Sequence, residues 1–504
     1  MLMIKKLWDE KPLTLILFSA GFFRLLAVLF SKGFGMHDDH FLVIEMAQSW
    51  VDHSYYNWLP FGDSPIRTAT GHSLFYTGLN FLMLKAMAMM GLTDPQLKMY
   101  FIRFVHAAFS LLVVYYGFKI TEFYSGAKVA RIAGLLLAIL WFMPMLSVRN
   151  LVEMVCIPFL MAPVWLIIKN GEMKKKSIYL LAGLVAGTAF SIRFQSSLFI
   201  TGIGLTLVVE KNWRAVIAYG AGTVVSVLLI QGSIDMFLWG KPFAEFMGYV
   251  KFNREHAYDF VTHGAETYPL LISGILLPPI SLFLWFGYFR NWRKQLIIFL
   301  PSFLFFVFHT SFPNKQERFI LPFIPFFIML GCIGWQEFVS GSAFWIKRPK
   351  LLRNCWIFFW ALNILPLCVV SVAYSKRNRV ESMTYLYHKK DAGILIIDDA
   401  NNDDIILPPL FYLRPLRDKW GVIPVTKSQS PRKVRDILKT ADKKYFPNYV
   451  IFWGEDNIET RVDSMKKYFP QLQYETTIEP GLVDRIVHYL NPINQNQTTY
   501  IYKL

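Results

Sequence analysis

The chain has 504 residues, of which 54% are hydrophobic and 17% aromatic, and its mean hydropathy is +0.36. This composition excludes an ordinary water-soluble globular protein and indicates a polytopic membrane protein with the lipid bilayer as its solvent. The formal net charge of +17 does not indicate a nucleic-acid partner, because Lys and Arg gather in short loops between hydrophobic segments, as they do in cytoplasmic loops of membrane proteins.

The first hydrophobic segment, residues 12–31, follows Lys5, Lys6 and Lys11. It is too long for the apolar core of a signal peptide and has no small-residue cleavage site. We therefore expect it to remain as a first span, with the N-terminus in the cytoplasm. The four cysteines lie in or beside hydrophobic segments, which predicts neither a disulfide framework nor a metal centre.

A second hydrophobic segment, Leu74–Leu92, conflicts with the distribution of charge. If it crossed the membrane, every later basic loop would lie outside the cytoplasm, against the positive-inside rule. Lys85 lies near its middle and glycines interrupt it. We interpret it as an interfacial or re-entrant helix of the first outer loop, residues 32–102, with a twelfth span as the alternative.

The remaining hydropathy pattern predicts about eleven transmembrane helices and a C-terminus outside the cytoplasm. Their expected ranges are 12–31, 103–120, 129–148, 154–169, 177–192, 196–210, 213–232, 268–289, 295–312, 318–336 and 355–373. Residues 233–267 form a second large outer loop. From residue 374 the chain has strand-length apolar runs at 393–397 and 449–453. We predict an all-α membrane domain over 1–373 and a small extracytoplasmic α/β domain over 374–504.

The first outer loop begins with the acidic motif His37-Asp38-Asp39-His40-Phe41. A carboxylate beside a membrane is partly desolvated, which makes it a plausible general base. The two adjacent acids would point different ways and are not expected to share one role. An alternative interpretation of the motif, to which we give equal weight, is a hydrated N-cap of a helix. A metal site built from His37 to His40 ranks lower, because its ligands would have to leave regular helical spacing, so a divalent metal is not favoured.

Further ionisable and polar residues fall at the expected outer ends of later spans. They are Arg149, Asn150, Glu153, Arg193, Lys315, Glu317 and Arg318. A lone arginine at a helix end commonly snorkels toward water, and Arg193 by itself would be interpreted so. A set of cations on one face instead predicts a site that holds a phosphate leaving group.

The second outer loop interleaves polar residues with aromatic ones. Asn253 and His263 lie among Phe252, Tyr258 and Phe260, a combination that suits sugar rings. An amphipathic loop lying on the membrane surface explains the same pattern equally well.

These elements resemble the GT-C glycosyltransferases that use polyprenyl-phosphate sugars, above all the mannosyltransferases of glycosylphosphatidylinositol and N-glycan assembly in glycosyltransferase family 22. The family's first-loop pattern, His-Pro-Asp-Glu-x-Phe-Gln with a following Glu, is similar to residues 37–41 and Glu45. Arg149-Asn150-Leu151-Val152-Glu153 is similar to a second family element. The family's His-Lys-Glu-x-Arg-Phe element is similar to residues 314–319, although Gln316 interrupts the Lys-Glu pair and the first motif lacks its Pro.

The resemblance implies a GT-C fold and sugar transfer on the extracytoplasmic face, with a polyprenyl-phosphate sugar as donor. Asp38 would occupy the position of the base and Asp39 that of the neighbouring acid. His37, Glu45 and the residues of the outer face would bind or orient substrate. An inverting transfer needs only one base and a stabilised leaving group.

Our hypothesis is a transferase that moves a hexose, with mannose favoured, to a hydroxyl of a glycan or lipid-linked acceptor. The alternatives are a transporter or flippase for a lipid-linked sugar and a non-catalytic glycan-binding subunit. Transporters usually carry internal repeats, and we find none in the sequence. We favour a bacterial inner membrane over the endoplasmic reticulum, although Asn496-Gln497-Thr498 is a glycosylation sequon.

Overall fold

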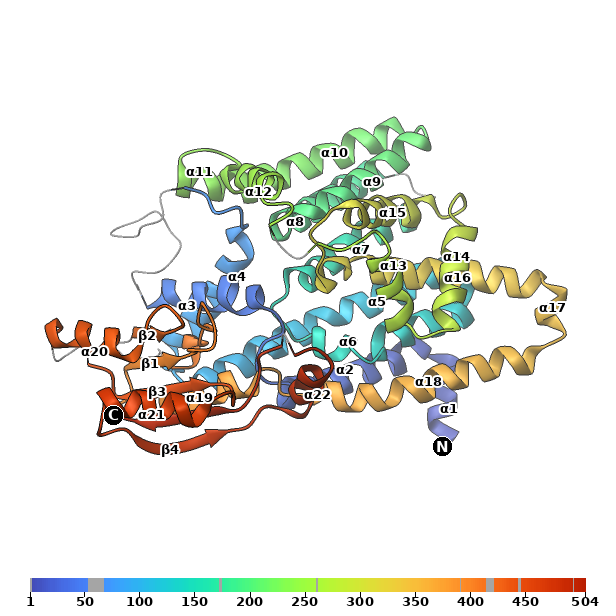
Figure 1. Ribbon diagram of the computed structural model, residues 1–504. Helices are drawn as coiled ribbons and strands as arrows, with labels where there is room; N and C mark the ends of the chain where they lie inside the picture. The colour runs from blue at the N-terminus through green and yellow to red at the C-terminus, as the bar shows by residue number, and fades with distance from the viewer. Residues whose placement is uncertain are drawn as a thin grey trace. The chain divides into compact units, whose positions relative to one another are not determined.

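A computed structural model describes residues 2–52, 68–171, 175–259, 262–389, 391–413, 421–442, 446–492 and 494–504 (Figure 1). Phe260, one of the aromatic residues of the second outer loop, lies outside these described residues. The chain divides into two compact units. The membrane unit comprises Met1–Val28, Tyr55–Asn80 and Ile102–Ser371, and the C-terminal unit comprises Leu29–Ser54, Phe81–Phe101 and Val372–Leu504.

Helices dominate the described residues, and six of them are long and apolar enough to cross a membrane. These are Pro12–Phe30 (α2), Pro95–Ile139 (α5), Val152–Asn170 (α7), Trp213–Trp239 (α10 and α11), Phe323–Gly341 (α16) and Pro349–Ser371 (α18). Shorter apolar helices are Leu74–Met89 (α4), Lys176–Ile192 (α8), Phe194–Val209 (containing α9) and Leu296–Ser311 (α15). The protein is therefore a mostly helical, multi-pass membrane protein, whereas the number of eleven spans stays a prediction.

The helical path is interrupted at two places among the described residues. The expected helix 268–289 is two helices, Thr267–Ile275 (α13) and Ile280–Arg290 (α14). The break follows from Pro278 and Pro279, which have no N–H group to donate within a helix, and the preceding Leu277 has a positive φ of 53°. In α5 the helical path is interrupted at Gly126, where φ is 73°, a conformation that glycine adopts without a Cβ clash.

Glycines allow several membrane helices to approach closely. A Cβ added to Gly287 of α14 would lie 2.1 Å from the carbonyl oxygen of Gly331 in α16. Likewise, a Cβ on Gly183 of α8 would lie 2.0 Å from the carbonyl oxygen of Tyr219 in α10. Small residues at helix contacts provide van der Waals packing in a membrane, where the hydrophobic effect does not drive helices together.

The C-terminal part of the chain folds as the expected small α/β domain. Its strands are Ile394–Asp398 (β1), Gly421–Val425 (β2), Tyr449–Trp453 (β3), Gln473–Ile478 (β4) and Thr499–Lys503 (β5), and its helices are Arg377–Tyr387 (α19), Pro431–Thr440 (α20), Ile458–Tyr468 (α21) and Leu482–Leu490 (α22). The sheet order is β2-β1-β3-β5-β4, with β1 parallel to β2 and β3 and with β5 antiparallel to its neighbours. Ile396 and Phe452 pack in its core with Val434 of α20 and Met465 of α21.

Candidate active site

The acidic motif lies in the C-terminal unit, at the start of the π-helical turn Asp39–Glu45. Asp39 is buried, and its carboxylate accepts hydrogen bonds from the backbone N–H groups of Gly35 at 2.8 Å and Met36 at 3.0 Å. Asp38 is half-buried and makes no N-cap bond with its side chain, and His37 is exposed. Asp39 therefore holds the loop that precedes it.

Two cations of the C-terminal unit support the same loop. The Lys376 ammonium donates to the carbonyl oxygens of Phe34, at 3.5 Å, and Gly35. The Arg379 guanidinium lies 5.2 Å from the centre of the Phe34 ring, and burial lowers the pKa of Arg379 to about 10. Sequence analysis did not identify these two residues, although the basic run that contains them directly follows the last hydrophobic segment.

Glu45 connects the π-helical turn Asp39–Glu45 to a later part of the chain. Its buried carboxylate accepts the N–H of Phe411 at 2.7 Å and lies 3.5 Å from Nε2 of His40. The His40 ring stacks on Tyr412, with ring centres 5.6 Å apart. In the described parts of the chain no three His, Cys, Asp or Glu side chains group to hold a metal ion, so nothing there supports the alternative metal site of residues 37–40.

The membrane unit brings together three of the predicted residues that are distant in sequence. Glu153, in the first turn of α7, lies between Arg193 and Arg318, with its Oε1 3.7 Å from Nη2 of the first and 3.8 Å from Nε of the second. All three side chains are more than nine-tenths buried. Arg193 also donates to the carbonyl oxygen of Phe319 at 3.3 Å. Arg149, four residues before Glu153 in the sequence, is buried as well.

This cluster combines two cationic side chains with one anionic side chain. Two guanidinium groups face one carboxylate, and the ion-pair distances exceed the 2.7–2.9 Å that is typical of charge-assisted hydrogen bonds. Among the described residues, Nη2 of Arg193 and Oε2 of Glu153 have no hydrogen-bond partner. A buried charged donor without an acceptor is unfavourable, and an anion with several oxygens would complete the cluster.

Other predicted residues make different contacts. Asn150 donates to Oδ1 of Asn80 at 2.8 Å and to the Tyr76 hydroxyl at 3.3 Å, within a buried network. Lys315 donates to the carbonyl oxygens of Phe312 at 2.6 Å and His263 at 2.9 Å. The second of these bonds joins the segment that contains Lys315 to the segment that contains His263. These contacts give Asn150 and Lys315 positions in the fold, and their binding roles stay predictions.

The remaining predicted residues lie at or near the surface. Asn253 donates to the carbonyl oxygen of Tyr249 in its own helix, Ala244–Glu255 (α12), at 2.9 Å. His263 and Glu317 are exposed. The substrate-binding roles expected for these three residues stay predictions.

A buried acid that sequence analysis did not identify joins two segments of the membrane unit, one from each of the predicted outer loops. Glu245 of α12 accepts the backbone N–H groups of Gly71 at 2.6 Å and His72 at 3.1 Å. Its own N–H donates to Asp235 at 3.0 Å. Gly71 has a φ of 84°, and a Cβ there would lie 3.0 Å from the Tyr249 backbone, so this contact requires glycine.

We expect Glu245 to make stability depend on pH. Burial raises the pKa of Glu245 from 4.5 to about 7, so between these values the folded state binds more protons than the unfolded state. The contribution of Glu245 to stability should therefore be largest below pH 4.5 and be lost, by about 3 kcal/mol, as pH rises through 7. Thermal unfolding of the purified chain between pH 4 and 8 measures this decline, which Glu245→Gln should remove.

The matched control is Glu255→Gln, an exposed acid at the end of the same helix. This variant should unfold with the pH dependence of the original chain. An unchanged pH dependence in Glu245→Gln would assign the decline to another group.

Solved structures with the same architecture are GT-C glycosyltransferases. The chain is 12% identical to ArnT from Cupriavidus metallidurans bound to undecaprenyl phosphate, with 97% of each chain covered and a TM-score of 0.63. It is 11% identical to the oligosaccharyltransferase AglB from Archaeoglobus fulgidus in complex with an inhibitory peptide and a dolichol-phosphate, with 92% of this chain and 71% of that chain covered and a TM-score of 0.51. At these identities the similarity establishes the GT-C fold.

The sequence establishes the family. The profile of the Alg9-like mannosyltransferase family matches residues 15–393, and the chain belongs to that family. No curated protein sequence matches the chain significantly. The protein is thus a membrane glycosyltransferase of the GT-C class, as the sequence motifs predicted.

Proposed function

We propose that the protein transfers mannose from a polyprenyl-phosphate donor to a hydroxyl group of a glycan or lipid-linked acceptor on the extracytoplasmic face. The observation that carries this proposal is the buried cluster of Arg193, Arg318 and Glu153, in which two guanidinium groups face one carboxylate and Nη2 of Arg193 has no hydrogen-bond acceptor among the described residues. A phosphate group offers the charge and the oxygens that such a cluster lacks. Family membership supports mannose as the sugar.

In the proposed reaction Asp38 is the general base. It accepts the proton of the acceptor hydroxyl while the hydroxyl oxygen forms a bond to the anomeric carbon of the sugar. The bond from that carbon to the phosphate oxygen breaks, and the phosphate leaves with the bonding electrons. Arg193 and Arg318 stabilise the charge that develops on it. Attack opposite the leaving group inverts the anomeric configuration.

The support for a lipid-linked donor is chemical and comparative. The ArnT structure contains undecaprenyl phosphate and the AglB structure contains a dolichol-phosphate, both of which are lipid phosphates. We further propose a cytoplasmic N-terminus, an extracytoplasmic C-terminus and a bacterial inner membrane. The first two follow from the distribution of basic loops.

The proposal predicts a defined donor specificity for the purified chain in liposomes. Labelled mannosyl polyprenyl phosphate should give a covalently mannosylated product with lipid-linked glycan acceptors, with inverted anomeric configuration, measured by chromatography and NMR. Glucosyl polyprenyl phosphate and a nucleotide-linked mannose, tested at the same concentration, are the matched controls. Label that crosses the liposome membrane without covalent transfer would favour the flippase alternative, and transfer from the nucleotide sugar alone would contradict the proposed donor.

A further inference from the structure

Helix α22 of the C-terminal unit exposes its apolar side. Leu482, Ile486, Tyr489 and Leu490 are exposed by 65%, 47%, 86% and 74%, and their spacing of four, three and one residues puts them on one face of the helix. A helix on the surface of a water-soluble domain normally turns such a face toward the core. The orientation of α22 is the reverse, which indicates that an apolar environment covers it.

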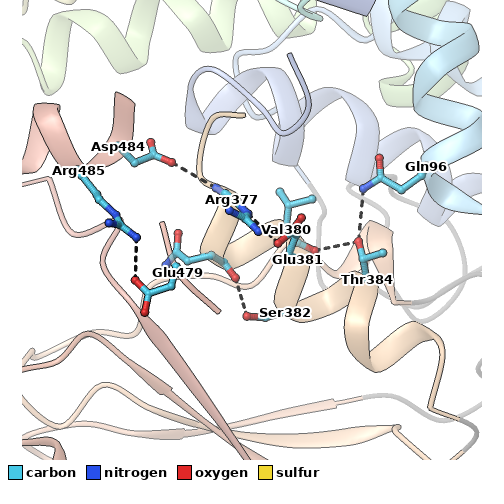
Figure 2. Close-up of polar contacts among 10 residues, drawn as sticks. Gln96, Arg377, Val380, Glu381, Ser382, Thr384, Glu479, Asp484 and Arg485 are labelled. Atoms are coloured by element: carbon cyan, nitrogen blue, oxygen red, sulfur yellow. Dashed lines mark hydrogen bonds and ion pairs between the residues drawn. The ribbon is translucent and has the colours of Figure 1, made fainter. Parts of the chain in front are cut away.

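Polar contacts fix this orientation. Asp484 on the opposite side is buried and accepts the backbone N–H of Arg377 at 3.3 Å, as Figure 2 shows. His488, one turn later, makes hydrogen bonds through Nδ1 to the carbonyl oxygen of Asn494 at 2.6 Å and through Nε2 to the Gln497 amide at 3.0 Å. The exposed flank carries Arg485, paired with Glu479 at 3.0 Å. The polar side of α22 is therefore attached to its domain, and the apolar side faces away from it.

The chain itself indicates what covers this face. Arg377, which holds the first turn of α22, is six residues after Ser371, the last residue of the membrane-crossing helix α18. Six residues of extended chain reach about 20 Å at most. The start of α22 is thus restricted to the neighbourhood of a membrane surface. Tyr489 fits that location, because tyrosine is enriched where hydrocarbon meets lipid headgroups.

We infer that α22 lies in the interface of the membrane leaflet next to the end of α18, with Leu482, Ile486, Tyr489 and Leu490 inserted at the boundary of headgroups and acyl chains. A short amphipathic helix binds this boundary through its apolar face and keeps its polar face in water or on protein. The inference rests on the membrane topology and on the contacts of α22, and it does not require the proposed transfer reaction.

Lipid-depth fluorescence on the full chain tests this inference. In a chain whose four cysteines are replaced by serine, Tyr489→Cys is labelled with an environment-sensitive fluorophore and placed in lipid nanodiscs. The matched control is Ile437→Cys on α20, which is 56% exposed in the same unit. Nitroxide-labelled lipids should quench the label at 489 at least roughly threefold more than the label at 437, and its emission should shift to the blue.

A second variant separates lipid contact from simple exposure. Adding Ile486→Asp to the Tyr489→Cys chain places a charge on the inserted face and should reduce the quenching toward that of the control. Because Ile486 is exposed, the substitution should leave the fold intact, and an unchanged thermal midpoint verifies this. Equally weak quenching at 489 and 437 would overturn the inference. A further measurement places donor-labelled and acceptor-labelled chains together in one nanodisc. Energy transfer between the two labels would overturn the inference and assign the apolar face of α22 to contact with a second copy of the chain.

Discussion

Replacing Asp38 by Asn is expected to lower kcat for sugar transfer by roughly 10²- to 10⁴-fold, the contribution that a positioned general base makes. Asn has nearly the same shape as Asp but does not accept the proton of the acceptor hydroxyl. Because the donor phosphate is assigned to other residues, KM for the donor should stay within about twofold of its original value. Steady-state transfer with labelled donor measures both constants.

Asp39→Asn is the matched control, because the adjacent acid has a different role. Its carboxylate holds the backbone N–H groups of Gly35 and Met36, so the substitution should lower the thermal midpoint and reduce kcat less than Asp38→Asn does. Near-normal turnover of Asp38→Asn would remove it as the base. Loss of activity in Asp39→Asn alone, at an unchanged midpoint, would give the role to Asp39, and full activity of both variants would contradict a catalytic motif.

Replacing Arg193 by Gln should lower kcat/KM for the lipid-phosphate donor by roughly 10²-fold, as the loss of one charged donor to a developing oxyanion does. The substitution removes the guanidinium whose Nη2 has no hydrogen-bond acceptor among the described residues, and with it one of the two positive charges that face Glu153. Competition with free polyprenyl phosphate measures the affinity directly. Arg254→Gln on α12, an exposed cation of the second outer loop, is the control and should change binding by less than about twofold.

Glu153→Gln distinguishes a phosphate site from a structural ion pair. It leaves two buried guanidinium groups without their carboxylate and should destabilise the ligand-free protein by about 3–5 kcal/mol. Added polyprenyl phosphate should then raise its thermal midpoint more than that of the original chain, because the ligand replaces the missing negative charge. If Arg193→Gln loses stability but keeps its donor affinity, the cluster is structural only.

Much of the helical fold could be predicted from apolar runs and the charges that bound them. The expected helices 154–169 and 177–192 are close to α7 and α8, because polar residues border both runs. The expected helix 268–289 was wrong because a hydropathy average does not register the missing N–H groups of Pro278 and Pro279. The loss of backbone hydrogen-bond donors at two adjacent prolines ends this helix, whereas the polarity of the side chains does not.

Part of the candidate site could be predicted from the residue type and from the expected side of the membrane. Glu153, Arg193 and Arg318 were predicted as ionisable groups on one outer face, and the structure joins these three into a cluster. The contacts of Lys376 with the carbonyl oxygen of Phe34, 342 residues away, and of Glu245 with Gly71, 174 residues away, were not predicted. Both are side-chain contacts with backbone groups, which leave no periodic pattern in either segment.

The contact between the acidic loop and a much later segment also sets an order of events during synthesis. Glu45 bonds to the N–H of Phe411, which is 366 residues later, and at roughly 5–20 residues per second the ribosome needs on the order of 20–70 s to make that stretch. The loop with Asp38 and Asp39 leaves the ribosome directly after the first helix. The contact of Glu45 with Phe411 can form only after the later helices have been synthesised. A nascent chain that ends before Phe411 therefore contains the acidic motif but lacks the Glu45 contact that joins the motif to this later segment.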